Sequence, residues 1–298
     1  MKNSHVSVSG VTDFSGDNMI DFDKSIFENR RQLNRPFLAA HRGVSGANVP
    51  CNTILSFKTA IEQGADVVEI DVSKSRDNAY FVFHPGMEHR YIGEDVRLEE
   101  LSAREIERIP LLNADGVPTH YRIPALQEVF ALLKGKAYIN VDKFWTDIRG
   151  ITAEIRRAGV EKQVIVKTPV EDTYFAETET YAPDLMYMSV ARDRDDVTDR
   201  LFGRNIRFIG TEALFTTEQD EIASAAYIRS MHARKLLVWA NAIVYDEKDV
   251  ISANLTDDLS LEKGVAAGWG KLIDRGFDFI QTDWLLPLKA YLQTRQTK

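Results

Sequence analysis

The chain reads VVEIDVSKSRDNAYFVFH over residues 67–84, and this stretch decides how the fold is interpreted. Its first six residues are apolar and β-branched apart from two carboxylates, which is typical of a buried strand. A second β-forming run, 79–84, follows after a gap of six residues. No helix fits into that gap, so we expect the two runs to form an antiparallel hairpin.

Glu69 and Asp71 lie two positions apart in the first run. Side chains alternate along a strand, so both carboxylates should point to the same face. Two carboxylates in a barrel interior repel each other and lose solvation, and a hard divalent cation is the simplest compensation. The alternative is a salt-bridged structural pair near the end of the strand.

His84 ends the second run of the expected hairpin. A turn on residues 76–77 would place His84 opposite Glu69, and a turn on residues 77–78 would place it opposite Asp71. Either way the hairpin brings an acid/base group back to the two carboxylates, beside the expected cation.

The same kind of apolar run recurs along the chain and alternates with stretches of helical period. The strand-like runs are 37–41, 67–72, 137–142, 164–167, 185–190, 207–210, 236–241 and 279–283. The helix candidates are 52–63, 124–134, 146–158, 173–181, 220–234 and 265–275. This alternation is typical of parallel α/β architecture.

The number of runs and the chain length favour one closed barrel. Eight parallel strands over about 250 residues form a (β/α)8 or TIM barrel, which we predict for residues 35–298 with the short hairpin after its second strand. An open doubly wound sheet would normally carry a Gly-rich fingerprint after its first strand, whereas His41-Arg42-Gly43 stands there. Residues 1–34 are polar without a sustained period, and we expect an N-terminal arm or loop.

Several strand-like runs end in a polar residue, and in barrels the carboxyl ends of the strands carry the chemistry. These residues are His41, Asp142, Lys167, Asn241 and Asp283. We expect them to converge on one mouth, although polar residues also simply mark the ends of strands. His41 should lie near Glu69 and Asp71, because the first two strands of a barrel are neighbours.

These positions suggest divided roles. His41 and His84 can act as an acid and a base at neutral pH, and either could instead be a metal ligand or a satisfied core residue. Arg42 suits bidentate phosphate binding, or it is a solvated charge at the rim. Asp142 is the natural third oxygen ligand, with Asn140 on the same strand face.

Composition excludes other classes of protein. The 298 residues include 37 basic and 45 acidic side chains, for a net charge of −8, and no long basic run predicts nucleic-acid binding. Cys51 is the only cysteine, so no intrachain disulfide can form. Residues 1–20 lack an apolar signal core, and no apolar run approaches the roughly 20 residues of a membrane span. We therefore expect a soluble, cytoplasmic protein whose oligomeric state stays open.

Five short motifs occur in a specific order and spacing. They are His41-Arg42-Gly43, Asn52-Thr53 with Ser56-Phe57, Gly64-Ala65-Asp66, Val68-Glu69-Ile70-Asp71-Val72 and His84. Together they resemble the glycerophosphodiester phosphodiesterase family, densely over residues 38–84 and thinly through 140–142, 164–167, 238–241 and 280–283. The resemblance implies a (β/α)8 barrel, one divalent cation (Mg, Ca or Mn), and cleavage of a diester to sn-glycerol 3-phosphate and an alcohol.

The resemblance also implies a role for each matching residue. His41 and His84 match the acid/base histidines, and Arg42 matches a phosphate-binding residue. The remaining matches are the metal ligands Glu69, Asp71 and Asp142, and a late-strand pair near the substrate, Trp239 and Asn241.

This chain departs from the family pattern at three positions. Cys51 stands where the family usually has Glu, Pro85 where Asp usually follows the histidine, and Phe144 where a lysine is often found. Lys143 is adjacent, but neighbouring strand residues face opposite ways, so Lys167 is the better candidate for a second cation at the phosphate. Both lysines could equally be solvated rim residues.

We predict a metal-dependent phosphodiesterase acting on a small-molecule glycerophosphodiester, with water or a neighbouring glycerol hydroxyl as the nucleophile. One alternative is a lipid phosphodiesterase of phospholipase D or C type, which needs an apolar access surface. The tryptophans that could supply this surface are Trp145, Trp239, Trp269 and Trp284. A second alternative is a non-catalytic barrel that binds phosphorylated ligands, for which the changes at Cys51 and Pro85 would be the support.

Overall fold

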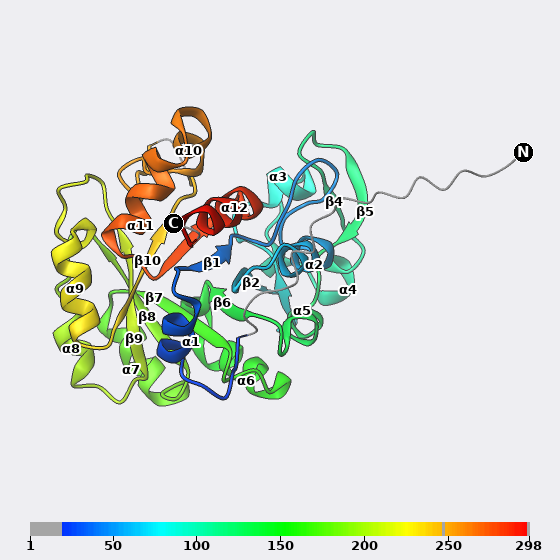
Figure 1. The fold of residues 1–298 in the computed structure, drawn as a ribbon. Coiled ribbons are helices and arrows are strands. Elements are labelled where there is room, and N and C mark those ends of the chain that lie inside the picture. Colours follow the sequence, from blue (N-terminus) through cyan, green and yellow to red (C-terminus); the bar gives the residue numbers. More distant parts are fainter. Residues whose placement is uncertain (1–19, 246–247, 297–298) are drawn as a thin grey trace, which may run out of the picture.

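A computed structural model of the protein describes residues 20–245 and 248–296. Its centre is a closed barrel of parallel strands (Figure 1), in which β1 pairs with both β2 and β11. The barrel strands are β1 (Phe37–Ala40), β2 (Val67–Lys74), β6 (Tyr138–Asp142), β7 (Val164–Pro169), β8 (Met186–Arg192), β9 (Phe208–Leu214), β10 (Leu237–Asn241) and β11 (Phe279–Thr282). The prediction of a (β/α)8 barrel is confirmed, and each strand overlaps a predicted run.

Helices surround the strands (Figure 1). The predicted helices correspond to α2 (Ile54–Glu62), α5 (Leu126–Leu133), α6 (Ile148–Ala158), α7 (Asp172–Tyr181), α9 (Ala225–Ala233) and α11 (Lys271–Arg275). A short 3-10 turn, η3 (Glu221–Ala223), precedes α9, and a π-helical turn, η4 (Ala266–Gly270), precedes α11. The sequence did not predict α8 (Thr198–Phe202), α10 (Asp257–Lys263) or α12 (Leu285–Gln296).

Helix α6 shows how the local sequence produces these elements. Asp147 caps its first turn by accepting a hydrogen bond from the backbone N–H of Gly150, and Gly159 ends it in the left-handed conformation. Between these ends, Ile148, Ile151 and Ile155 recur at helical spacing and are buried against the barrel. The apolar face therefore fixes the side of the helix that contacts the strands.

Helix α1 (Ile26–Leu33) lies within the segment for which we expected an N-terminal arm or loop. Its Ile26 and Leu33 are buried in the cluster that fills the barrel interior, together with Phe37, Trp239 and Phe279. The helix has only 8 residues, which is too few for its apolar positions to form a sustained period in the sequence. Residues 1–19 of the expected arm lie outside the described residues.

The hairpin after the second barrel strand is present. β3 (Tyr80–Val82) is antiparallel to β2, but Ser73 pairs with Phe81, so the turn is centred on Asp77 and both predicted registers were wrong by one residue. The reason is a three-residue turn in which Asn78 adopts a left-handed conformation with φ 66°.

An insertion follows the hairpin and lies at one side of the barrel (Figure 1). It contains α3 (Glu88–Ile92), η1 (Leu98–Glu100), α4 (Ala103–Ile106), β4 (Pro110–Leu112) and β5 (Pro118–Arg122). Strands β4 and β5 form a second antiparallel pair that the sequence did not predict, and a separate apolar cluster holds the insertion together. Within the described part of the chain, no helix combines the length and apolar character that a bilayer crossing requires.

Gly210 is expected to be irreplaceable in the barrel wall. Its φ is +153°, and a Cβ atom there would lie 1.9 Å from the carbonyl oxygen of Leu237 on the neighbouring strand. Gly210→Ala should lower the free energy of unfolding by about 3 kcal/mol, because backbone atoms in a sheet cannot move aside. Gly116→Ala is the control, since Gly116 also has a positive φ but no described atom lies within 4 Å of the place that a Cβ would take; it should cost only about 1 kcal/mol. Equal losses in urea denaturation would contradict this account.

Candidate active site

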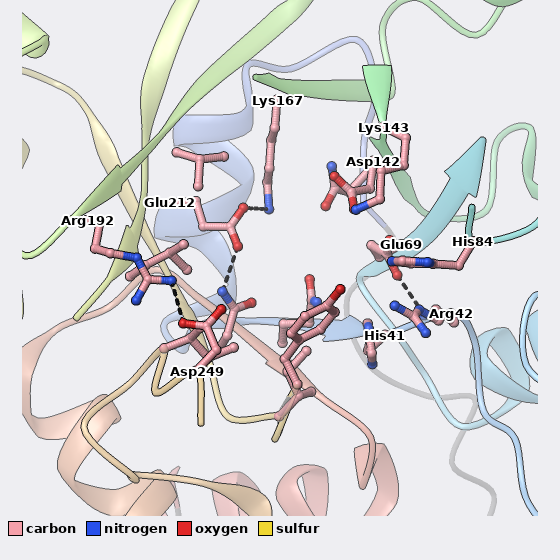
Figure 2. Close-up of a pocket in the computed structure, with 18 of the residues that line it drawn as sticks. His41, Arg42, Glu69, His84, Asp142, Lys143, Lys167, Arg192, Glu212 and Asp249 are labelled. Atoms are coloured by element: carbon pink, nitrogen blue, oxygen red, sulfur yellow. Dashed lines mark hydrogen bonds and ion pairs between the residues drawn. The ribbon is translucent and has the colours of Figure 1, made fainter. Parts of the chain in front are cut away.

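The carboxyl ends of the barrel strands surround a cavity of about 200 Å³ (Figure 2), which we call the first cavity. One side carries the predicted residues His41, Arg42, Glu69, His84 and Asp142. The opposite side is an aliphatic wall with an Arg192–Asp249 ion pair of 2.9 Å at its rim. The wall residues are Val190, Leu214, Ile243 and Ile251.

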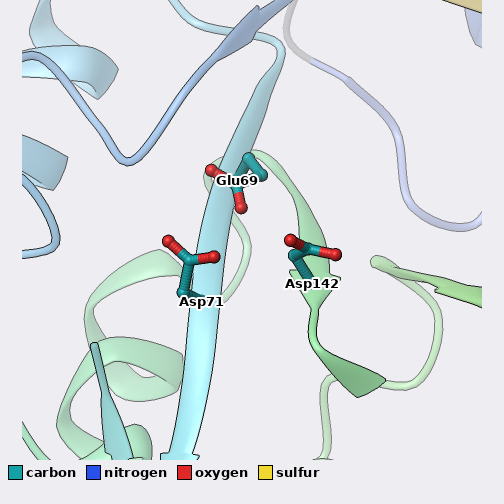
Figure 3. Close-up of side chains that lie close together, drawn as sticks. All are labelled: Glu69, Asp71 and Asp142. Carbon is teal, nitrogen blue, oxygen red and sulfur yellow. The ribbon is translucent and has the colours of Figure 1, made fainter. Parts of the chain in front are cut away.

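Three carboxylates, Glu69, Asp71 and Asp142, lie close together (Figure 3), and Glu69 and Asp142 of this cluster line the first cavity while Asp71 is fully buried beside it. Glu69 and Asp71 project from the same face of β2, and the parallel register pairs Asp71 with Asp142 of β6. Each carboxylate offers an oxygen atom, and these atoms all lie within 4.8 Å of one another. The alternation of side chains along β2 therefore produces a cluster that can hold a metal ion.

The contacts of this cluster fit a divalent cation. Burial raises the pKa of Glu69, and the neighbouring Asp71 raises it further. The backbone N–H of Arg42 donates to Glu69 Oε2 at 2.8 Å, and Asn52 donates to Asp71 Oδ2 at 2.8 Å. Asp71 Oδ1 is buried without a hydrogen-bond partner among the described residues. A buried carboxylate oxygen without a donor is costly, and a cation would compensate it.

Both histidines are held by their Nδ1 atoms. His41 Nδ1 lies 2.8 Å from Asp283 Oδ1 at the end of β11, and His84 Nδ1 lies 2.7 Å from the carbonyl oxygen of Pro85. A carbonyl oxygen only accepts, so His84 carries its proton on Nδ1 and its Nε2 is left free when the ring is neutral. His84 Nε2 lies 4.0 Å from Asp71 Oδ1. The predicted return of His84 to the carboxylates is therefore observed.

The surroundings of the two rings differ. Burial opposes protonation of His41, but the carboxylates of Asp283 and Glu69 together outweigh this effect and raise the pKa. Burial lowers the pKa of His84; Asp71 opposes that shift, while Arg42 and Lys143 add to it. The surroundings of His41 therefore favour its charged form, and those of His84 favour its neutral form.

Lys143 corrects a prediction, because its side chain does reach the cavity. Its Nζ lies 2.8 Å from Asp142 Oδ2. β6 ends at Asp142, and Lys143 has a left-handed φ of 60°, so the strand alternation that would turn it away no longer applies. Phe144 is fully buried in the core.

Lys167, the other lysine expected near the phosphate, is held in a buried network. The sequence predicted some members of this network but not Glu212. Lys167 Nζ lies 2.9 Å from Glu212 Oε2 and 3.3 Å from the centre of the Trp239 ring. Asn241 donates to Glu212 Oε1 at 2.6 Å and accepts from Trp239 Nε1 at 3.1 Å. Glu212 was missed because the predicted strand stopped at Gly210, although a lone carboxylate in the run Phe208–Leu214 was a usable signal.

Two of the four tryptophans cannot contribute to the apolar access surface considered from the sequence, because they are fully buried. Trp239 is fully buried, stacks on Phe279 at 4.7 Å, and contacts Lys167 and Asn241, which line the first cavity. Trp269 is also fully buried, and only Trp145 lines the first cavity. Trp284 is 49% exposed.

The fold and the site together define a class: a (β/α)8-barrel protein with a three-carboxylate centre and two histidines at the carboxyl ends of its strands. The model of the Glycerophosphoryl diester phosphodiesterase family matches residues 41–241, and the chain belongs to this family.

Individual relatives agree with this membership. A glycerophosphodiester phosphodiesterase of Caldanaerobacter subterraneus is 35% identical over 106 residues, which are 35% of this chain and 43% of that protein. The chain therefore spans about half the length of the curated relatives it matches.

Solved structures share the fold at low sequence identity. A glycerophosphoryl diester phosphodiesterase from Parabacteroides distasonis has a TM-score of 0.70 at 16% identity, covering 91% of this chain and 93% of its own. An Oleispira antarctica phosphodiesterase in complex with the product sn-glycerol-3-phosphate has a TM-score of 0.64 at 17% identity, covering 88% of this chain and 98% of its own.

Proposed function

We propose that the protein hydrolyses glycerophosphodiesters to sn-glycerol 3-phosphate and an alcohol. The observation that carries this proposal is Asp71 Oδ1, which is buried without a hydrogen-bond donor among the described residues and belongs to a carboxylate cluster that two histidines flank. Family membership supports the same reaction class, and the Oleispira antarctica relative was solved with sn-glycerol-3-phosphate as its product.

Cationic groups of the chain would surround the phosphate. A divalent cation, Mg, Ca or Mn, held by Glu69, Asp71 and Asp142 would supply Lewis-acid stabilisation of a phosphate oxygen. Arg42, which is 8% exposed, and Lys167 would neutralise the remaining charge of the phosphate group.

The two histidines would divide the proton transfers. The partner of His41 is a carboxylate, which favours the charged ring, so His41 donates a proton to the leaving alcohol. The partner of His84 is a carbonyl oxygen, which leaves Nε2 of the neutral ring free to accept a proton from the nucleophile. The nucleophile is water or a neighbouring hydroxyl of the glycerol.

The function is tested by assaying the purified protein on glycerophosphocholine after removal of metals with a chelator. We expect release of sn-glycerol 3-phosphate, measured with a coupled dehydrogenase, only after Mg, Ca or Mn is restored. Intact phosphatidylcholine serves as the comparison substrate for the lipid alternative, which has less support because Trp239 and Trp269 lie in the core. If the protein binds the cation but hydrolyses no diester, the result would favour the alternative of a non-catalytic barrel that binds phosphorylated ligands.

The acid role of His41 predicts a shift in the pH profile of Asp283→Asn. Since Asp283 raises the pKa of His41, an acid at this position loses its proton, and activity falls, as the pH rises through that value. Removing the carboxylate lowers the pKa, so the alkaline limb of kcat against pH should move to lower pH while the acidic limb stays in place. Movement of the acidic limb instead would make His41 the base.

Lys167 and Glu212 are expected to be coupled in phosphate binding. Glu212→Gln should weaken binding of inorganic phosphate about tenfold, because burial lowers the pKa of Lys167 and its carboxylate partner opposes that shift. In a Lys167→Met background the same change should improve binding, since Glu212 would then be an unpaired negative charge. Calorimetry on the four proteins measures the coupling. Equal effects in both backgrounds would show that the two residues act independently.

A further inference from the structure

A second cavity, of about 220 Å³, adjoins the first. The two cavities share His41, Arg42 and Tyr245, and are otherwise lined by different residues. The second cavity lies between the loop after β1, the insertion helix α3 and the loop after β10. Its other lining residues are Ser45, Cys51, Met87, Arg90, Tyr91, Val244 and Asp283.

The charged groups of the second cavity are mainly cationic. Arg42 and Arg90 line it together with His41, and Arg42 Nε also lies 2.9 Å from Asp71 Oδ2. Its carboxylate, Asp283, is already engaged by His41 Nδ1 at 2.8 Å. The Arg90 guanidinium lies 5.5 Å from the centre of the Tyr91 ring, and no carboxylate of the described residues forms an ion pair with it. Arg90 can therefore bind an anionic group without breaking an existing pair.

The first cavity offers different chemistry away from the carboxylates. Its far wall is aliphatic, and the charges at its rim, Arg192 and Asp249, neutralise each other. Glu212 and Asn241 at its floor can contact hydroxyl groups, as can Gln281. A phosphodiester has two ester arms, and a phosphate held between Arg42 and the carboxylates would direct one arm into each cavity.

We propose that the second cavity binds the leaving alcohol, and that Arg90 makes it favour an arm with a carboxylate over an arm with a quaternary ammonium group. This inference rests on the proposed function, in which His41 protonates the leaving oxygen. His41 borders both cavities, so an ester arm that enters the second cavity, on the side of Arg90 and Tyr91, also passes the ring that would give its proton. A guanidinium attracts a carboxylate through paired hydrogen bonds and repels a like charge.

The test compares three diesters of sn-glycerol 3-phosphate whose second alcohols are choline, glycerol and glycerate, with cationic, neutral and anionic arms. Wild-type protein should show kcat/KM in the order glycerate, glycerol, choline. Arg90→Glu should change the ratio of glycerate to choline about tenfold or more toward choline, and Arg90→Gln should give an intermediate ratio.

Arg104→Glu is the matched control, because Arg104 is an exposed arginine of the same insertion that lines neither cavity. It changes the net charge equally and should leave the ratio unchanged. An unchanged ratio in Arg90→Glu, with hydrolysis intact and an unchanged melting temperature, would overturn the inference and leave the proposed function standing. Failure of wild-type protein to hydrolyse any of the three diesters with a divalent cation would overturn both.

Discussion

Replacing His41 or His84 by alanine is expected to lower kcat for glycerophosphodiester hydrolysis by about 10²–10⁴-fold each. Both rings are fixed through Nδ1, so each presents Nε2 as its reactive atom. Without either ring one proton transfer loses its positioned partner, whereas Glu69 and Asp71 remain in place. Binding of the divalent cation, measured by calorimetry, should therefore change much less than turnover.

A histidine far from the cavity provides the control. His232 Nε2 lies 2.8 Å from Asp278 Oδ2, so it resembles His41 in having a carboxylate partner, but Asp278 precedes β11 at the opposite end of the barrel. His232→Ala should keep near-normal kcat. Near-normal hydrolysis by His41→Ala or His84→Ala, with any diester that proves to be a substrate, would rule out the proposed acid–base scheme.

Removing a carboxylate from the cluster is expected to abolish the response of the protein to divalent cations. Asp71→Asn should have the largest effect, weakening cation binding by more than about 100-fold, because Asp71 Oδ1 is buried and has no protein donor among the described residues. Activity should be lost in parallel. Glu69→Gln and Asp142→Asn should weaken binding in the same direction.

The same variants make a second prediction for thermal stability. A cation present at about 100 times its Kd stabilises the wild-type fold by about 2.7 kcal/mol through mass action, which raises the melting temperature. That rise should disappear in Asp71→Asn. Asp147→Asn is the control, since Asp147 binds Lys74 and Tyr80 outside the cluster and should keep the cation-dependent rise even if its basal stability falls. An undiminished rise in Asp71→Asn would exclude this cluster as the cation site.

Much of the barrel, and the part of the site formed by Glu69, Asp71 and His84, could be predicted because they depend on local geometry. Strand side chains alternate with a period of two residues, so Glu69 and Asp71 had to share a face wherever β2 was placed. The return of His84 also followed locally, since a gap of six residues leaves room only for a hairpin. Its register did not follow, because the left-handed residue Asn78 creates a three-residue turn that the sequence did not distinguish from the shorter ones.

The remaining site residues depended on where strands end, which distant pairing decides. β9 extends to Leu214 because it pairs with β8 as far as Arg192, and this brings Glu212 into the barrel mouth. Lys143 enters the cavity because β6 ends at Asp142, so the alternation of strand side chains does not extend to Lys143. Trp239 sits below the mouth because its ring packs on Phe279 of the neighbouring strand.

The sequence by itself determined the eight-stranded barrel, the carboxylate pair on β2 and the histidine that returns to it, because each follows from periodicity or from a short gap. Only the tertiary structure decided the partners of the site residues, which are Asp283 for His41 and Glu212 for Lys167, and the position of the insertion that brings Arg90 to a cavity that Arg42 also lines. These partners come from segments far apart in the chain. Their meeting depends on the closure of the barrel and the packing of its loops, for which no local pattern exists.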